Sequence, residues 1–162
     1  MSKLWKPVAS IWAEGTPRPR RAKQGRVVGK GRHRFVQMYT PESSAATTWT
    51  QIVTAAALGR RPMQPFEGPV RLSWTAYFAR TKEMTVARYG SGPIPKINTP
   101  DEDNLNKIVA DVLTKLGFWH DDGQMWGGPR EKYYCGISGK PGMQIELAVM
   151  EEQPALLGGV AS

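Results

Sequence analysis

Residues 70–78 read Val-Arg-Leu-Ser-Trp-Thr-Ala-Tyr-Phe, and they decide the fold because apolar and more polar side chains alternate along them without a break. This period of two is typical of a β-strand that turns one face to a core. The stretch therefore predicts a central strand. The other elements are identified outward from it.

Two helices flank this strand in the sequence. The later one, ended by Gly117, has the clearest pattern, with apolar residues spaced as one helical face: Leu105, Ile108, Val109, Val112, Leu113 and Leu116. The earlier one is predicted to open at Thr40-Pro41 and to stop at Gly59. Its predicted buried face consists of Ala45, Ala46, Trp49, Ile52, Val53, Ala56 and Ala57.

Further strands are predicted at both ends of the chain. One covers Leu4–Ala13, one covers residues 125–137 with an interruption at Gly127-Gly128-Pro129, and the last presents Met143, Ile145, Leu147 and Val149 on one face. Residues 81–98 are predicted to be a loop. This order predicts an α/β fold: one domain over residues 1–152, with a mixed β-sheet and two main helices packed on it. Residues 153–162 are predicted to be a disordered tail.

The charge is divided unevenly along the chain. There are 22 Lys and Arg residues against 14 Asp and Glu, a net charge of +8, yet all five aspartates lie between residues 101 and 122. A basic body with one acidic focus indicates a polyanionic partner and a cation site, although a solvated basic surface is the alternative. The basic side chains gather in a predicted arm at about 16–38, where DNA phosphates are the expected ligand: Arg18, Arg20, Arg21, Lys23, Arg26, Lys30, Arg32 and Arg34.

Composition argues against several other classes of protein. One cysteine and two histidines exclude an internal disulfide framework and disfavour a structural zinc site. No stretch approaches the ~20 apolar residues of a membrane-spanning helix. We therefore expect a soluble, cytoplasmic protein with no membrane partner.

The acidic residues flank the later helix. Asp101-Glu102-Asp103 precedes it and Asp121-Asp122 follows it, so the two groups meet only if the chain after Gly117 turns back along the helix. Phe118-Trp119 is suited to anchor such a return. Clustered carboxylates repel one another unless a cation lies between them, and Mg²⁺ prefers carboxylate oxygens. We therefore expect a shared divalent ion, with Asp101 placed before the first helical turn.

A structural interpretation of the same acids stays open. Thr99-Pro100-Asp101-Glu102 is also typical of a helix start, where acids complement the positive end of the helix dipole. The late onset of the apolar period favours Asp103 as the capping residue. Asp103, Lys107 and Asp111 share a face, either as a surface ladder of ion pairs or with Lys107 stabilising charge on a phosphate.

A longer motif runs through this region. Residues 101–124 contain Asp101-x-Asp103-Asn104-Leu105-x-Lys107, then Asp111, and then Gly117-x-x-x-Asp121-Asp122-x-Gln124. This pattern resembles the central motif of the RusA family of Holliday-junction resolvases. Gly15-Thr16-Pro17 and Tyr39-Thr40-Pro41 resemble upstream features of the same family. The chain departs from it at Thr99, at Gly127–Pro129 and in the long 81–98 segment.

The resemblance implies a homodimeric endonuclease that cuts four-way DNA junctions with Mg²⁺, for which Mn²⁺ is expected to substitute. It assigns metal binding to Asp101, Asp103 and Asp122 and a catalytic cation to Lys107. Asp121, Asp111 and Lys132 are candidate supporting residues. The alternatives are a non-catalytic basic DNA-binding protein, and a related metal-dependent nuclease acting on other branched DNA or on RNA.

Overall fold

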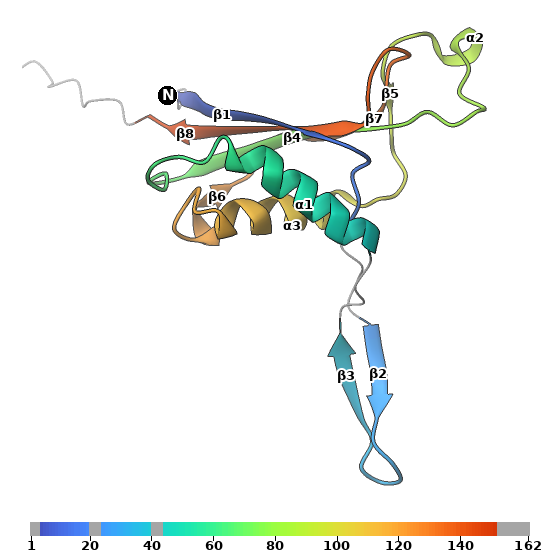
Figure 1. Cartoon of the computed structure of the whole chain (residues 1–162), viewed down its shortest axis with the longest axis vertical. Helices are drawn as coiled ribbons and strands as arrows, with labels where there is room; N and C mark the ends of the chain where they lie inside the picture. The colour runs from blue at the N-terminus through green and yellow to red at the C-terminus, as the bar shows by residue number, and fades with distance from the viewer. Residues whose placement is uncertain (1–3, 20–23, 40–43, 152–162) are drawn as a thin grey trace, which may run out of the picture.

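A mixed β-sheet organises the molecule. The computed structural model describes residues 4–19, 24–39 and 44–151. The sheet has six strands in the order β1 (Trp5–Glu14), β8 (Gly142–Met150), β4 (Val70–Phe78), β7 (Arg130–Tyr134) and β5 (Ile94–Pro95), with β6 (Met125–Trp126) also paired to β4. Strand β4 runs antiparallel to β8 and parallel to β6 and β7. The predicted central strand thus has the expected bounds and the central place (Figure 1).

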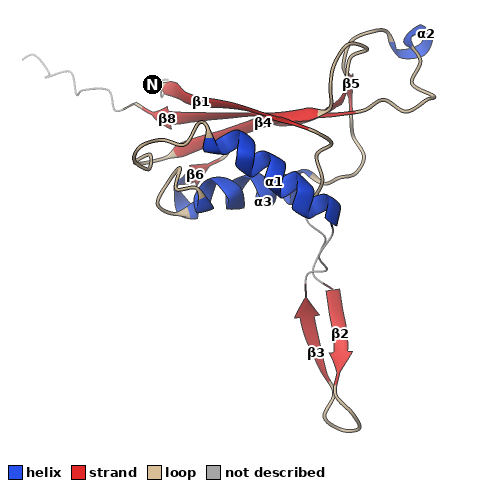
Figure 2. Ribbon diagram, viewed as in Figure 1, coloured by secondary structure: helices blue, strands red, loops and turns tan. Residues whose placement is uncertain are grey.

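Two helices lie against the sheet (Figure 2), and the core forms between them and the strands. They are α1 (Ser44–Leu58) and α3 (Glu102–Lys115). Every second residue of β4, from Val70 to Phe78, is buried. The strand β8 contributes Met143, Ile145 and Leu147, as its alternation predicted. This confirms the predicted single mixed α/β domain with two main helices.

The predicted basic arm is a β-hairpin that projects from the body (Figures 1 and 2). Its strands are β2 (Gln24–Val28) and β3 (Phe35–Tyr39), which pair with each other in a separate two-stranded sheet. The predicted start of the first helix at Thr40-Pro41 and the predicted tail at 153–162 lie outside the described residues. The helix α1 ends at Leu58, directly before Gly59, as expected.

The predicted interruption after residue 126 is also present. Strands β6 and β7 are separated by Gly127-Gly128-Pro129, and a Cβ at Gly128 would collide with the carbonyl of Leu72. The nitrogen of Trp74 donates a hydrogen bond to the Pro129 oxygen at 3.0 Å. Glycine is therefore required where this segment crosses close to β4.

Two local predictions were wrong. Residues 81–98 are not a loop throughout, because they contain the one-turn helix α2 (Val86–Tyr89) and β5. The N-cap of α3 is Asp101 and not Asp103, because the helix begins at Glu102. Its first turn is solvent-exposed and polar, so the apolar period starts later than the helix does. Within the described residues, no helix is long and apolar enough to cross a membrane.

Candidate functional site

Asp101 and Asp103 open the helix α3. Asp101 has an extended backbone (φ −67°, ψ 143°), and its side chain accepts no capping hydrogen bond from the helix. It therefore lies before the first turn, as the metal hypothesis requires. The Asp103 side chain is 88% exposed. Neither carboxylate is used to cap the helix or to fill the core, and both side chains are exposed.

Lys132 holds the segment that leads into Asp101. Its Nζ donates hydrogen bonds to the carbonyl oxygens of Asn98 at 2.9 Å and Pro100 at 2.8 Å. The ammonium group of Lys132 is therefore engaged with the backbone that precedes Asp101. Next to it, the Tyr134 hydroxyl lies 3.2 Å from the side-chain oxygen of Asn98. The polar contact with the Asn98 side chain, with help from the Lys96 ammonium group, lowers the pKa of Tyr134.

Two residues that the sequence analysis did not single out also contact the start of α3. Arg130 Nη1 lies 3.6 Å from Glu102 Oε1 and 3.9 Å from Asp103 Oδ1. The buried Asn106 side chain accepts a 3.0 Å hydrogen bond from Trp74 Nε1, which ties α3 to the central strand. The polar Asn106 within an apolar helical face was a usable signal. No sequence signal pointed to Arg130, because its contacts are with Glu102 and Asp103, which are distant in the sequence.

Lys107 and Asp111 follow Asp103 on the same helical face. Lys107 is exposed and Asp111 is half-buried. Lys107 therefore presents its ammonium group to solvent one helical turn beyond Asp103.

Asp122 lies at the other end of α3. Its Oδ1 accepts a 2.7 Å hydrogen bond from the Thr114 hydroxyl, which in turn accepts a 2.9 Å bond from Trp119 Nε1. Phe118 and Trp119 are buried, and the Phe66 nitrogen donates to the Phe118 oxygen at 2.7 Å. The pair anchors the chain after Gly117, as predicted.

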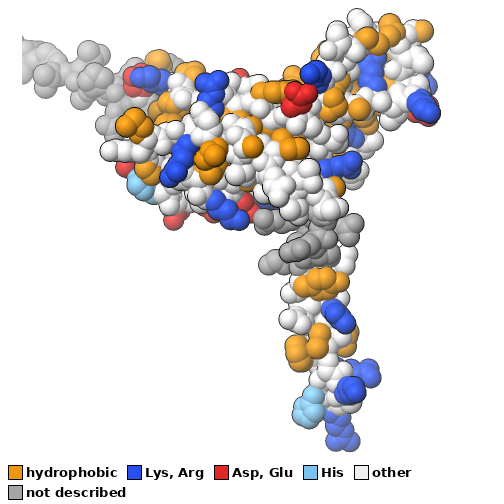
Figure 3. All heavy atoms as spheres, in the orientation of Figure 1, with side chains coloured by type: hydrophobic (Ala, Val, Ile, Leu, Met, Phe, Trp, Pro, Cys, Tyr) orange, Lys and Arg blue, Asp and Glu red, His pale blue; other side chains and the backbone are white. Residues whose placement is uncertain are grey.

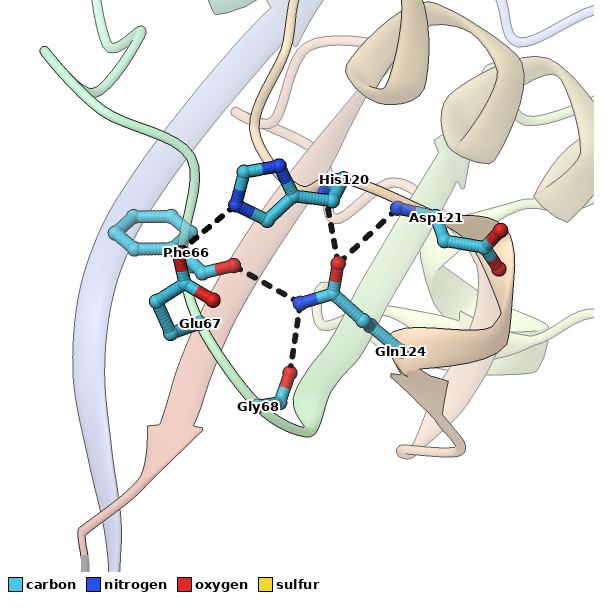
Figure 4. A network of polar contacts seen from close by, with 6 residues as sticks. All are labelled: Phe66, Glu67, Gly68, His120, Asp121 and Gln124. Atoms are coloured by element: carbon cyan, nitrogen blue, oxygen red, sulfur yellow. Dashed lines mark hydrogen bonds and ion pairs between the residues drawn. The ribbon is translucent and has the colours of Figure 1, made fainter.

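Asp121 and Gln124 shape the turn that carries Asp122. The Asp121 side chain caps a short 3-10 helix, accepting from the Gly123 nitrogen at 2.6 Å. The Gln124 amide accepts from the nitrogens of His120 and Asp121 and donates to the oxygens of Phe66 and Gly68 (Figure 4). The side chain at this position must both accept and donate hydrogen bonds, which explains the glutamine at the end of the motif. Asp121 is thus placed in a local structural role.

The same turn is held from a second side. His120 Nε2 lies 2.9 Å from Glu67 Oε1, and both side chains are more than half exposed (Figure 4). The segment 66–68 therefore contacts residues 118–124 through its backbone, through the Gln124 amide and through the His120–Glu67 pair. This fixes where Asp122 can lie relative to α3.

The two acidic groups do not converge within one chain. From Asp101 to Thr114 the helix rises by about 20 Å, and Asp122 is bonded to Thr114. Among the described residues, no three His, Cys, Asp or Glu side chains lie close enough to hold a metal ion. The expectation of a shared ion in a single chain was wrong, because the chain after Gly117 turns back only as far as the last helical turns. One chain alone does not fit a three-carboxylate metal site.

The predicted DNA-binding residues are spread along the hairpin and the segment before it. Five of them are described and all five are exposed: Arg18, Arg26, Lys30, Arg32 and Arg34. Figure 3 shows Lys and Arg side chains gathered on the projecting hairpin, together with apolar ones. Arg20, Arg21 and Lys23 lie outside the described residues. The DNA-binding role of the arm stays a prediction.

The fold and the acidic helix start define a mixed α/β protein with a polar site at one end of a sheet-packed helix. Comparison with protein families identifies the group to which it belongs. The family model described as Endodeoxyribonuclease RusA matches residues 14–148 of the 162. The chain belongs to the RusA endodeoxyribonuclease family, as its motif indicated, and membership implies an endonuclease acting on Holliday-junction DNA. No individual curated protein gives a significant sequence match.

Proposed function

We propose that the protein is a Mg²⁺-dependent endonuclease that resolves four-way DNA junctions by paired hydrolysis of two phosphodiester bonds. Family membership supports action on junction DNA. One observation carries the chemistry. Asp101 and Asp103 lie at the exposed start of α3 without capping the helix, and Lys107 lies one helical turn further on. Carboxylates with a phosphate oxygen are a typical ligand set for Mg²⁺.

We propose further that the complete site forms between two copies of the chain. One copy carries Asp101 and Asp103 at one end of α3 and Asp122 at the other. A two-fold axis across the middle of the exposed face of α3 would set the first end of one copy beside the last end of its partner. Two equivalent sites then arise, which suits an enzyme that must make two opposed cuts.

The chain's own side chains have distinct proposed tasks. Asp101, Asp103 and Asp122 would hold the divalent ion, which when bound supplies charge stabilisation to the phosphate. Lys107 would face the same phosphate and neutralise charge that develops on it. Lys132 keeps Asp101 in place, and the basic hairpin would bind the backbone of the DNA arms, with a strong dependence on salt.

Cleavage of labelled substrates tests the activity. A synthetic four-way junction, a linear duplex and a structured RNA are incubated with the protein in Mg²⁺, in Mn²⁺ and in EDTA. We expect symmetric cuts in the junction with either metal, and no cuts in EDTA. Junction binding without cleavage under all conditions would indicate a non-catalytic DNA-binding protein, and equal cleavage of RNA would indicate a broader nuclease.

Subunit mixing tests where the site lies. Asp103→Asn and Asp122→Asn homodimers, each inactive, are combined under conditions that exchange subunits. If the site joins two copies, the mixed dimer contains one intact site and cleavage returns as single nicks. Mixing Asp103→Asn with Asp101→Asn is the matched control and should restore nothing. No recovery in the first mixture, once exchange is verified by mass, would place the site within one chain, and a monomer in sedimentation would reject the dimer.

A further inference from the structure

Arg130 occupies an unusual place beside the start of α3. It is the first residue of β7, pairs in register with Trp74 of the central strand, and its side chain is only 20% exposed. The side chain of Trp74 is buried on the helix-facing side of the sheet. Because paired residues of neighbouring strands share a face, Arg130 lies on that side too, next to the first turn of α3.

The guanidinium group of Arg130 is poorly satisfied. Its Nε is buried and has no hydrogen-bond partner among the described residues. Its contacts with Glu102 at 3.6 Å and Asp103 at 3.9 Å exceed the usual hydrogen-bond length of about 3 Å. Arginine presents a planar fork of N–H donors, and burying such donors without partners is costly. Long, partly exposed ion pairs contribute too little to offset that cost.

We propose that Arg130 is a phosphate-binding residue of the nuclease site, whose ligand is a backbone phosphodiester next to Asp103. This inference rests on the proposed function. A phosphate accepts two parallel hydrogen bonds from a guanidinium group. Among the described residues, no side chain offers Arg130 such a pair of acceptors at hydrogen-bond distance. The phosphate would also take the guanidinium away from Asp103 and leave that carboxylate free for the divalent ion.

The nearby Lys132 is not free to bind a phosphate, which leaves that task to Arg130. Lys132, two residues further along β7, donates to the carbonyls of Asn98 and Pro100. Its ammonium group is therefore engaged in shaping the backbone. Lys107 reaches the site from the exposed face of α3 and Arg130 from the sheet side. A phosphodiester between them would meet positive charge on both sides.

Neutral phosphates in a synthetic junction test this proposal directly. Single methylphosphonates are placed one at a time around the exchange point, and binding is measured in EDTA, so that no cleavage and no metal are involved. For the unmodified protein we expect one position at which neutralisation weakens binding by about tenfold, the size of a charge-assisted hydrogen bond. For Arg130→Gln we expect no further loss at that position and the same losses elsewhere.

Two more variants make the result decisive. Arg130→Lys keeps the charge and should restore part of the sensitivity, while Arg130→Gln should lower the slope of log affinity against log salt by about 1. Lys140→Gln removes an equal charge from a surface lysine paired with Glu14 and should match the unmodified protein. Circular dichroism checks that all variants fold.

Each outcome separates the two proposals. If the unmodified protein binds the junction but Arg130→Gln shows the same methylphosphonate profile, Arg130 is only a structural counter-ion of Glu102 and Asp103, and the inference is overturned while the nuclease proposal stands. If the unmodified protein binds no junction, both are overturned.

Discussion

Asp122 accepts a 2.7 Å hydrogen bond from the hydroxyl of Thr114, at the opposite end of α3 from Asp101. The hydroxyl oxygen of Thr114 also lies 2.8 Å from the carbonyl oxygen of Ala110. The hydroxyl has a single proton to donate, and the charged carboxylate is the stronger acceptor. Trp119 Nε1 donates a hydrogen bond to the hydroxyl oxygen of Thr114. One threonine thus connects a candidate metal ligand to the buried ring that anchors its turn.

Replacing Thr114 by valine should loosen this connection. Thr114→Val leaves Trp119 Nε1 and Asp122 without their partner, so we expect unfolding free energy to fall by about 1–3 kcal/mol and junction cleavage to slow. The matched control is Thr54→Val, because Thr54 also donates to a backbone carbonyl within a helix but lies outside the site. Urea unfolding and a cleavage time course measure the two effects. Equal cleavage by both variants would show that the Thr114 hydroxyl is not needed to hold Asp122 in place.

Asp103→Asn separates binding from cleavage. The change removes a charge from a side chain that is 88% exposed, so the fold should be unaffected and repulsion from DNA should decrease. We expect junction binding to be retained or tightened and cleavage to be lost. Glu151→Gln, which changes an exposed carboxylate paired with Lys6 outside the site, is the control and should still cut. Gel-shift and cleavage assays decide, and unchanged cleavage by Asp103→Asn would exclude this carboxylate from the site.

Lys132→Met should impair cleavage through the backbone. The lysine holds the carbonyls of Asn98 and Pro100, and without it the segment before Asp101 gains freedom. A small displacement of a reacting group is costly to catalysis. We therefore expect cleavage to fall by about 10²-fold, with binding in EDTA near the original. Lys140→Met is the matched control. A parallel loss of binding would show instead that Lys132 contacts DNA.

Gln124→Ala tests the turn that carries Asp122. The amide makes four hydrogen bonds, two as acceptor and two as donor. We expect the unfolding free energy to fall by about 2 kcal/mol or more, at roughly 0.5–1.5 kcal/mol for each bond. Gln144→Ala, which loses one bond to Ser10, should cost about 1 kcal/mol by the same measure. Similar losses for both variants would contradict the network.

Two adjacent tyrosines should ionise in a defined order. The hydrogen bond to Asn98 lowers the pKa of Tyr134, whereas the hydrogen bond to Glu131 raises the pKa of Tyr133. In an alkaline titration followed by phenolate absorbance, Tyr134→Phe should remove the earlier transition and Tyr133→Phe the later one.

The sign for stability follows from these directions. Tyr134 contributes stability that is present above pH ~10, the pKa of an unfolded tyrosine, and that is lost as the pH falls through its lower folded value. Tyr133 contributes stability that is present below that pH and is lost as the pH rises. The reverse order of ionisation would contradict the contacts with Asn98 and Glu131.

The sequence alone was sufficient for the architecture and for the family. Strict alternation from Val70 to Phe78 predicted the central strand, and the apolar period from Leu105 to Leu116 predicted the main helix, because both signals come from residues close together in the chain. The acidic motif identified the family for a similar reason, since its spacing lies within one continuous stretch. The placement of Asp101 before the first turn was also correct.

Only the tertiary structure decided how the acidic groups lie. The motif contains Asp122 but does not state how far the chain returns after Gly117, because that depends on Phe66, Gly68 and Thr114, which bind the turn from other elements. Arg130 faces the start of α3 because its strand pairs with Trp74. Such contacts join residues that are distant in the sequence, and they arise from packing and hydrogen bonding that no local period encodes.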